Sequence, residues 1–327
     1  MASVASRIPL GLVLATAVLA LLVVGLGAYV RLSDAGLGCP DWPGCYGHLT
    51  PHHAADAIVA AYAQAPEGPV SPAKAWKEMV HRYLAATLGL AIMVIAWLAW
   101  RREQGVSRAV GLGLVGLVVF QGLLGMWTVT LLLRPVIVSA HLLGGMATLA
   151  LLVWLVARLQ GIPGTERSGP VQMAGLALAA VALQIVLGGW VSTNYAALAC
   201  TDFPTCHGSW WPQADWLRGF QLHRELGMDT QGQALSLEAL TAIHWAHRLG
   251  ALAASLAVGY LGLRLLPHPA WRAWGFGLLG LLALQVSLGV ANVLAGLPLS
   301  VAVAHNLGAA LLLSGLVWVN VKIRRAV

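Results

Sequence analysis

Charged side chains are scarce in this sequence. Asp, Glu, Lys and Arg make up 9% of the 327 residues and hydrophobic residues make up 59%, whereas about 25% of the residues in a soluble domain are charged. This scarcity excludes a soluble globular protein and predicts an integral membrane protein. The net charge of +7 does not indicate nucleic-acid binding, because that function needs a basic, water-exposed face, which this chain does not have.

Long apolar stretches account for most of the chain. A membrane-spanning helix needs about 20 predominantly apolar residues. Stretches that reach or approach this length cover 8–30, 80–100, 109–132, 136–157, 171–192, 242–264, 272–294 and 299–321. The first is longer than the apolar part of a usual signal peptide and has no small-residue cleavage pattern, so we expect it to be retained. The predicted fold class is an all-α integral membrane protein with eight transmembrane helices.

Lys and Arg are distributed unequally between the two sides of these predicted helices. One side carries Arg7, Arg101, Arg102, Arg108, Arg158, Arg167, Arg264, Arg272, Lys322, Arg324 and Arg325. The other side carries Arg31, Lys74, Lys77, Arg134, Arg218 and Arg224. Because cytoplasmic segments carry the excess of Lys and Arg, both termini are predicted to lie in the cytoplasm. In a bacterial inner membrane, the cysteine-containing loops would then be periplasmic.

The sequence contains only four cysteines, in two similar segments. Cys39 and Cys45 lie in CPDWPGC, and Cys200 and Cys206 lie in CTDFPTC. Four cysteines allow three pairings, but the similarity of the segments favours one short disulfide in each half of the chain. Such bridges are stable in an oxidising compartment, and either a structural or a redox role is open. A zinc site is less favoured, because its ligand pairs usually have shorter spacing.

The two halves of the chain repeat the same pattern. Residues 120–141 read FQGLLGMWTVTLLLRPVIVSAH and residues 284–305 read LQVSLGVANVLAGLPLSVAVAH. Each half has four predicted spans, an even number, so both halves enter the membrane from the same side and form parallel repeats. We therefore predict two tandem parallel four-helix bundles, formed by residues 1–160 and 161–327. The turn-rich segment 158–170 is the expected boundary.

Four histidines recur in this pattern. His81 and His141 in the first half correspond to His247 and His305 in the second half. All four are predicted within the first one or two turns of their helices, at one depth, so each pair can face a common space. One membrane histidine is better explained by a hydrogen bond to a neighbouring helix. Four in a duplicated pattern favour axial ligands of haem iron.

An arginine directly follows one histidine in each half. Arg82 follows His81, and Arg248 follows His247. Charged groups inside a membrane are costly and need partners. Haem propionates are plausible partners for both arginines.

The halves differ at one chemically important position. Glu78 lies three residues before His81 in KEMVHR, whereas His244 lies three residues before His247 in AIHWAHR. A carboxylate beside a haem can donate or accept protons, but a charge near a helix start also interacts favourably with the helix dipole. His244 competes with His247 as a ligand, although the shared His-Arg dipeptide favours His247.

At these motifs the chain resembles the haem A synthase family, which includes bacterial CtaA and mitochondrial Cox15. The resemblance extends over essentially the whole chain. It rests on GLGCPDWPGCYG, EMVHRYLAATLGL, SAHLLGG, IHWAHRLGA and VAHNLGAA in this order. Some members of this family lack the loop cysteines, and this chain is similar to those that retain both pairs.

The resemblance implies a membrane oxidoreductase that converts a methyl group of haem O to formyl by successive hydroxylations. The N-terminal bundle would bind the substrate haem O through His81 and His141, with Glu78 as the catalytic carboxylate. The C-terminal bundle would hold haem b as a cofactor through His247 and His305. The expected partners are a haem O synthase, a terminal oxidase in assembly and membrane lipid. A homo-oligomer is compatible with the sequence.

The histidine spacing alone leaves two other functions open. A dihaem cytochrome b that oxidises quinol would use the same histidine pairs and make no new haem. A transporter of haem or another small molecule is a further alternative, because parallel repeats also occur in transporters.

Overall fold

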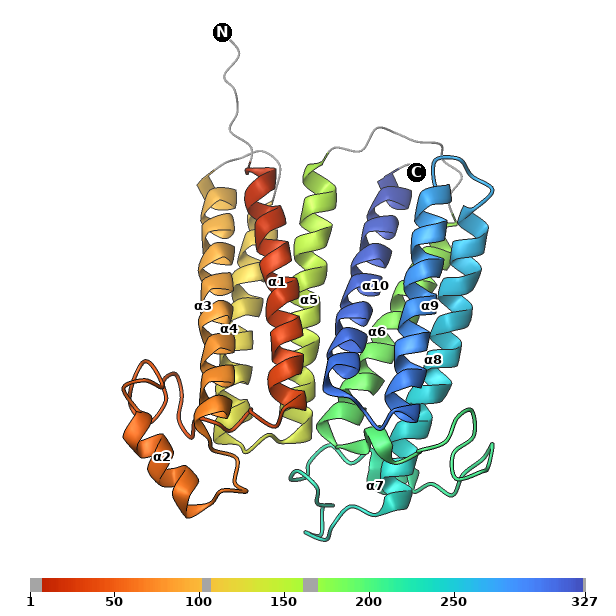
Figure 1. The fold of residues 1–327 in the computed structure, drawn as a ribbon. Helices are drawn as coiled ribbons and strands as arrows, with labels where there is room; N and C mark the ends of the chain where they lie inside the picture. The colour runs from red at the N-terminus through yellow and green to blue at the C-terminus, as the bar shows by residue number, and fades with distance from the viewer. Residues whose placement is uncertain (1–7, 102–106, 161–169, 326–327) are drawn as a thin grey trace. The chain divides into compact units, whose positions relative to one another are not determined.

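The structure is a computed structural model, which describes residues 8–101, 107–160 and 170–325. Within these ranges the chain forms helices, turns and isolated bridges, without a strand. Eight of the described helices are long and apolar enough to cross a membrane. They are α1 (Leu10–Leu32), α3 (Pro72–Arg101), α4 (Arg108–Thr130), α5 (Pro135–Leu159), α6 (Val171–Thr193), α8 (Leu237–Leu265), α9 (Arg272–Leu294) and α10 (Leu299–Arg325) (Figure 1). The predicted all-α fold is confirmed, and the chain is a multi-pass membrane protein.

Two long connecting segments carry the cysteines and contain short helices. The first disulfide segment, residues 33–71, includes α2 (Ala55–Gln64). The second disulfide segment, residues 194–236, includes the 3-10 helix η1 (Ala196–Leu198) and α7 (Trp216–Gly219). These segments join α1 to α3 and α6 to α8. We call the helix ends that they connect the disulfide ends.

Two helices begin earlier than the apolar pattern predicted. Their spans were expected to start at residues 80 and 242, but α3 begins at Pro72 and α8 at Leu237. The Ser71 hydroxyl accepts the Lys74 N–H at 3.2 Å, and the Ser236 hydroxyl accepts the Ala239 N–H at 3.3 Å. Such serine caps stabilise a helix start that lies in polar sequence, which a search for apolar stretches does not detect.

The earlier starts change the position of two histidines along their helices. At 1.5 Å per residue, His81 lies about 14 Å and His247 about 15 Å from the start of its helix. His141 and His305 each lie about 9 Å from the start. The prediction that all four lie within the first two turns is therefore wrong for His81 and His247.

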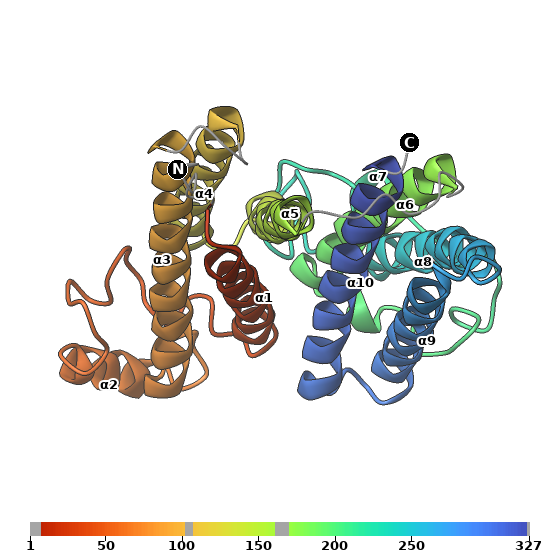
Figure 2. The same ribbon diagram turned by 90° about the horizontal axis from the view of Figure 1, so that it is seen from above.

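The residues group into two compact units. One contains Met1–Thr130 and Gly144–Pro163, and the other contains Leu131–Leu143 and Gly164–Val327. In the first unit, α1 packs against α3, and α3 packs against α4. In the second unit, α6 packs against α8, α8 against α9, α9 against α10 and α10 against α6, which closes a ring of four helices (Figure 2). The arrangement as two tandem bundles stays a prediction.

Some sequence features fall outside the part of the chain that the structure describes. Most of the predicted boundary, residues 161–169, is among them, as are Arg7, Arg102 and Arg167.

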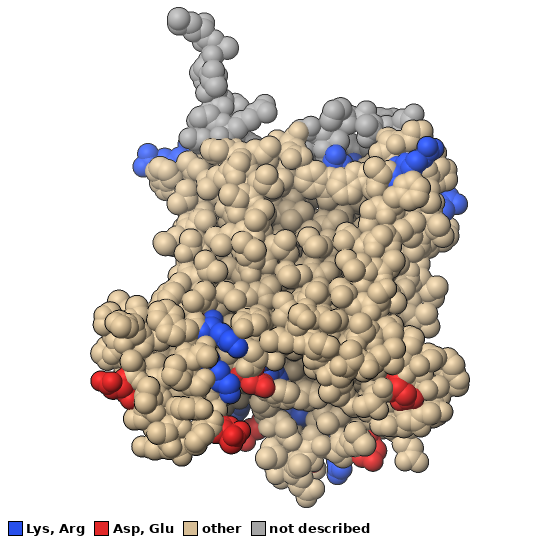
Figure 3. Space-filling model, in the orientation of Figure 1, with Lys and Arg blue, Asp and Glu red and all other residues tan. Residues whose placement is uncertain are grey.

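Acidic residues are concentrated at the disulfide ends of the helices. All described Asp and Glu residues lie in the disulfide segments or in the first two turns of α3 and α8. The opposite helix ends carry Arg101, Arg108, Arg158, Arg264, Arg272, Lys322 and Arg324. On the face in Figure 3, red side chains lie toward one end only, while the other end shows blue alone.

Candidate functional site

Each disulfide segment is closed by one short disulfide. Cys39 is bonded to Cys45, and Cys200 is bonded to Cys206. All four cysteines are fully buried. The predicted pairing of one bridge in each half is confirmed.

An aspartate inside each disulfide loop organises the turn that follows it. Asp41 accepts the backbone N–H groups of Tyr46 and Gly47, each at 2.7 Å. Asp202 accepts those of His207 and Gly208, at 2.8 and 2.9 Å. The hydrogen bond from the Thr205 hydroxyl, together with these backbone bonds, holds the pKa of Asp202 well below its ordinary value. The ionised carboxylate accepts both backbone N–H groups of the turn.

Glu78 and Arg82 attach the first disulfide loop to α3. Glu78 is 4% exposed, and its Oε2 accepts the Cys39 N–H at 2.9 Å. Its Oε1 accepts a hydrogen bond from Arg82. Arg82 also donates to the carbonyls of Asp41, at 2.9 Å, and of Gly44. Both carboxylate oxygens of Glu78 therefore accept hydrogen bonds, one from the loop and one from Arg82. We call Glu78, Arg82 and the loop groups that they contact the disulfide-loop anchor.

His244 and Arg248 form the corresponding anchor in the second unit. The Cys200 N–H donates to His244 Nδ1 at 3.3 Å, and Arg248 Nε lies 3.2 Å from His244 Nε2. Arg248 donates to the carbonyls of Thr205 at 2.7 Å and Cys200 at 3.1 Å. His244 therefore takes the place that Glu78 has in the first anchor, where the first cysteine N–H and the arginine meet. The two anchors differ in charge rather than in architecture.

The two anchor arginines were expected to pair with haem propionates. In the structure, Arg82 and Arg248 instead direct guanidinium groups to the carbonyls of the disulfide loops. These contacts supply polar partners for both cations, and pairing with propionates stays a prediction.

Two glutamines contact the predicted histidine ligands of the second unit. Gln184 on α6 has its Nε2 2.9 Å from His247 Nδ1 and donates to the His247 carbonyl at 3.0 Å. Gln285 on α9 has its Nε2 3.3 Å from His305 Nε2. His247 lies on α8 and His305 on α10, so the two predicted haem b ligands belong to the same ring of four helices.

Glycines of neighbouring helices lie directly against three of the histidine rings. A Cβ added at Gly188 would lie 3.0 Å from His247 Cε1, and one at Gly289 would lie 3.1 Å from His305 Cε1. In the first unit, a Cβ at Gly27 would lie 3.0 Å from His81 Cε1. A side chain at these positions would compete with the imidazole for space. These glycines therefore let the rings lie against a neighbouring backbone.

His141 lies on α5, in the second turn after Pro135. On the same helix, Gly144 lies against Gln121 of α4, whose Oε1 would be 2.6 Å from a Cβ at that position. Gln121 and Gly144 repeat the relation of Gln285 and Gly308, since a Cβ at Gly308 would also meet a glutamine Oε1.

The residues of the second unit fit an axially ligated haem. Among the described residues, buried His305 Nδ1 and Gln285 Oε1 have no hydrogen-bond partner. A buried polar group without a partner is unfavourable, and a ligating imidazole usually donates its second N–H to an acceptor. His247 and His305 would hold the iron, and Gln285 would be available to accept from a reoriented His305.

The contacts of Gln184 with His247 and of Gln285 with His305 were not predicted from the sequence. Gln285 has the same place in segment 284–305 as Gln121 has in segment 120–141, and this repetition could have suggested a role beside the ligand. Gln184 had no such indication. The position that corresponds to Gln184 in the first half is Val23, because these two residues have the same separation in sequence as Cys39 and Cys200.

The second disulfide segment covers the disulfide end of its own unit. Trp190 on α6 donates its indole N–H to the Gly219 carbonyl at 2.9 Å. Arg224 is 4% exposed, lies over the Trp190 ring and donates to Asn194 Oδ1 at 2.6 Å. Burial lowers the pKa of Arg224 from its ordinary value, while the Asp229 carboxylate acts in the opposite direction. These contacts show that the segment packs on α6.

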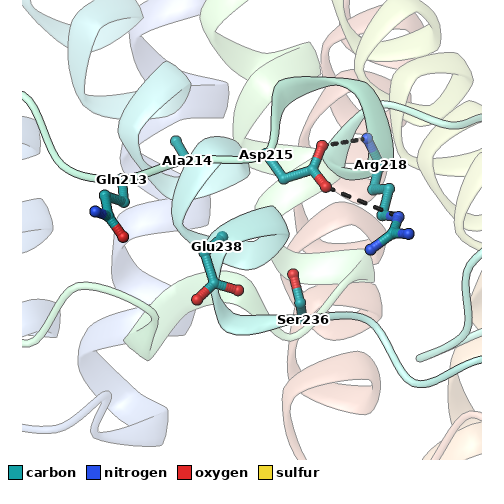
Figure 4. A pocket seen from close by; sticks show the side chains of 6 residues that line it. All are labelled: Gln213, Ala214, Asp215, Arg218, Ser236 and Glu238. Carbon is teal, nitrogen blue, oxygen red and sulfur yellow. Dashed lines mark hydrogen bonds and ion pairs between the residues drawn. The ribbon is translucent and has the colours of Figure 1, made fainter.

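A shallow surface pocket lies between α7 and the start of α8. Its lining residues are Gln213, Ala214, Asp215, Arg218, Ser236 and Glu238 (Figure 4). Asp215 caps α7 by accepting the Arg218 N–H, and Ser236 caps α8. None of the predicted site residues lines this pocket, and these polar groups serve the helix ends.

Comparison with known proteins agrees with this architecture. The chain is 44% identical over 309 residues to a protein of Shewanella oneidensis named heme A synthase, covering 93% of each chain. A heme A synthase of Sphingopyxis alaskensis is 31% identical over 324 residues, covering 92% of this chain and 87% of the relative. The model of the COX15-CtaA family, described as cytochrome oxidase assembly protein, matches residues 11–317. The chain therefore belongs to the COX15-CtaA family.

Proposed function

We propose that this protein is a haem A synthase, an oxidoreductase that converts the methyl group of haem O to formyl by successive hydroxylations. The observation that carries the proposal is full-length similarity to proteins named heme A synthase. It is combined with partly buried histidines that fit haem ligation. His81 and His141 would bind haem O, and His247 and His305 would bind haem b.

The difference between the two anchors supports this division of roles. When bound, the haem iron supplies the oxidative chemistry, and the protein positions the macrocycle and manages protons. Glu78 provides a carboxylate one helical turn from His81, whereas the second unit has His244 at the matching place. We propose that Glu78 holds or transfers a proton during oxidation of the methyl group.

A dihaem cytochrome b was the alternative from the histidine spacing. It is not favoured, because the similar proteins carry the name of an enzyme that makes haem A. Haem b as the resident cofactor is part of our proposal, supported by the His247 and His305 environment.

The distribution of charge supports a proposed orientation in the membrane. The helix ends that carry Lys and Arg but no described acidic residue would face the cytoplasm. Both termini of the chain would then lie in the cytoplasm. The disulfide loops would then lie in the periplasm of a bacterial cell, where disulfides persist. We further propose that a haem O synthase supplies the substrate, that a terminal oxidase in assembly receives haem A, and that homo-oligomers can form.

Pigment analysis tests the proposed reaction. The purified protein, produced in cells that make haem O and lack another haem A synthase, is expected to yield haem A on extraction. A matched strain without the protein should contain haem O and no haem A. A stable two-haem protein that oxidises quinol and forms no new pigment would contradict the proposal.

The two disulfides are expected to differ in function. In the double variant Cys39→Ser/Cys45→Ser the yield of haem A should fall more than about tenfold, because we propose that this bridge is redox-linked to catalysis. Cys200→Ser/Cys206→Ser should keep most activity. Both should lower the free energy of unfolding by about 2 kcal/mol, since the bridges close loops of equal length.

Haem A yield and thermal unfolding, measured on both double variants, separate these effects. If Cys39→Ser/Cys45→Ser folds normally and is as active as the unaltered protein under oxidising and reducing conditions, the redox role is wrong.

A further inference from the structure

A group of cations in the second unit has no acidic residue beside it in the part of the unit that the structure describes. Arg264, Arg272, Lys322 and Arg324 lie at the ends of α8, α9 and α10 opposite the disulfide segment. Every acidic residue described for this unit lies at the disulfide end. Among the described residues, Lys322 forms no salt bridge. The acidic residues that the structure describes in this unit therefore lie away from these cations.

Lys322 differs from its neighbours because it lies over two aromatic rings. Trp274 on α9 and Trp318 on α10 stack with ring centroids 5.9 Å apart and an interplanar angle of 22°. Lys322 Nζ lies 5.8 Å from the Trp274 centroid and 5.3 Å from the Trp318 centroid. We call these three residues the Trp-Lys platform. The stacked rings hold the ammonium group at a defined place between two helices.

The platform lies on a partly exposed part of the helix surface, where Trp274, Trp318 and Lys322 are each half-buried. In the most apolar part of α9 only 6% of the residues are buried, so most of them are at least partly exposed. Tryptophan prefers the level of lipid headgroups, where the indole contacts both apolar and polar groups. A cation at that level attracts the phosphate of an anionic lipid.

We propose that the Trp-Lys platform binds the headgroup of one anionic phospholipid. The ammonium group of Lys322 contacts the lipid phosphate, and the faces and edges of Trp274 and Trp318 contact the glycerol and upper acyl region. The lipid would place a negative charge beside these cations. Bound between α9 and α10, it joins two helices of the ring that carries His305.

A neighbouring cation provides a matched control. Arg264 on α8 lies over a single ring, that of Tyr260, at 6.0 Å. Substitution of Arg264 or Lys322 by Gln removes the same charge from the same end of the unit. A general attraction of anionic lipid to basic residues responds equally to both changes, whereas a defined site responds to Lys322 alone.

Native mass spectrometry of the full-length protein, titrated with phosphatidylglycerol, measures this difference. Lys322→Gln is expected to weaken binding of the tightest lipid about fivefold, because the direct contact of the ammonium group with the lipid phosphate is lost. Trp318→Leu should weaken it while keeping every charge, and Lys322→Arg should restore it. Arg264→Gln should change it less than about twofold. Phosphatidylcholine should show no dependence on Lys322.

Several outcomes would overturn the proposal. Equal weakening by Lys322→Gln and Arg264→Gln would show attraction to net charge without a site. Unchanged binding in folded Lys322→Gln, verified by its thermal unfolding, would also refute the platform. Displacement of the lipid by inorganic phosphate alone would show an anion site rather than a lipid site.

Discussion

Glu78→Gln is expected to reduce haem A formation by about 10²- to 10⁴-fold, the usual effect of losing a proton-transferring group, while haem remains bound. Haem O or a hydroxylated intermediate should accumulate in the variant. The reason is that glutamine has almost the shape of glutamate but cannot exchange a proton in the same way. Haem A, the hydroxylated intermediate and haem O can be separated by chromatography of the extracted pigment.

The anchor contacts make this a controlled substitution. The amide oxygen of a glutamine can still accept the Cys39 N–H, but the charge opposite Arg82 is lost. A hydrogen bond to a charged group contributes about 1.5–3 kcal/mol, so a lower unfolding temperature is expected as well. His244→Gln makes the equivalent change in the second unit and should lower stability without accumulation of haem O. Wild-type turnover by Glu78→Gln would refute the catalytic role of Glu78.

His247→Ala is expected to abolish the binding of haem b, because the variant lacks the imidazole that would hold the iron beside Gly188. The purified variant should lack the absorption bands of a low-spin haem b and should form no haem A. His81→Ala is the matched substitution in the first unit. It should retain haem b and fail to convert haem O.

Extracted pigment and the absorption spectrum of each variant test this division of roles. Loss of haem b from His81→Ala, with haem b retained in His247→Ala, would reverse the assignment of the two halves. Retention of haem b by both variants would make His244 the better candidate for the ligand.

The helical fold could be predicted from the sequence because burial in lipid requires long apolar segments with internal hydrogen bonds. The starts of α3 and α8 could not be found in the same way. Their first two turns contain Lys74, Lys77 and Glu238, which interrupt the apolar pattern. Ser71 and Ser236 were the available indications, since serine commonly precedes a helix.

The disulfide pairing could be predicted because the two similar segments give each cysteine a counterpart. The ligand role of the histidines stays a prediction. The anchor contacts could not be predicted, because they join residues about forty positions apart and depend on the path of the loop. Arg82 binds the Asp41 carbonyl, 41 residues away, and Arg248 binds the Thr205 carbonyl, 43 residues away. No periodicity in the sequence identifies a backbone carbonyl as the partner of a particular cation.

The first anchor also fixes how α3 is rotated about its own axis. Successive residues of a helix are about 100° apart, so Glu78 and Arg82 lie on one side, and His81 points about 60° away from Glu78. Any turn of the helix that moved the imidazole would pull both anchor side chains from the disulfide loop. A connecting loop near one end of the helix therefore determines the direction in which His81 presents its ring.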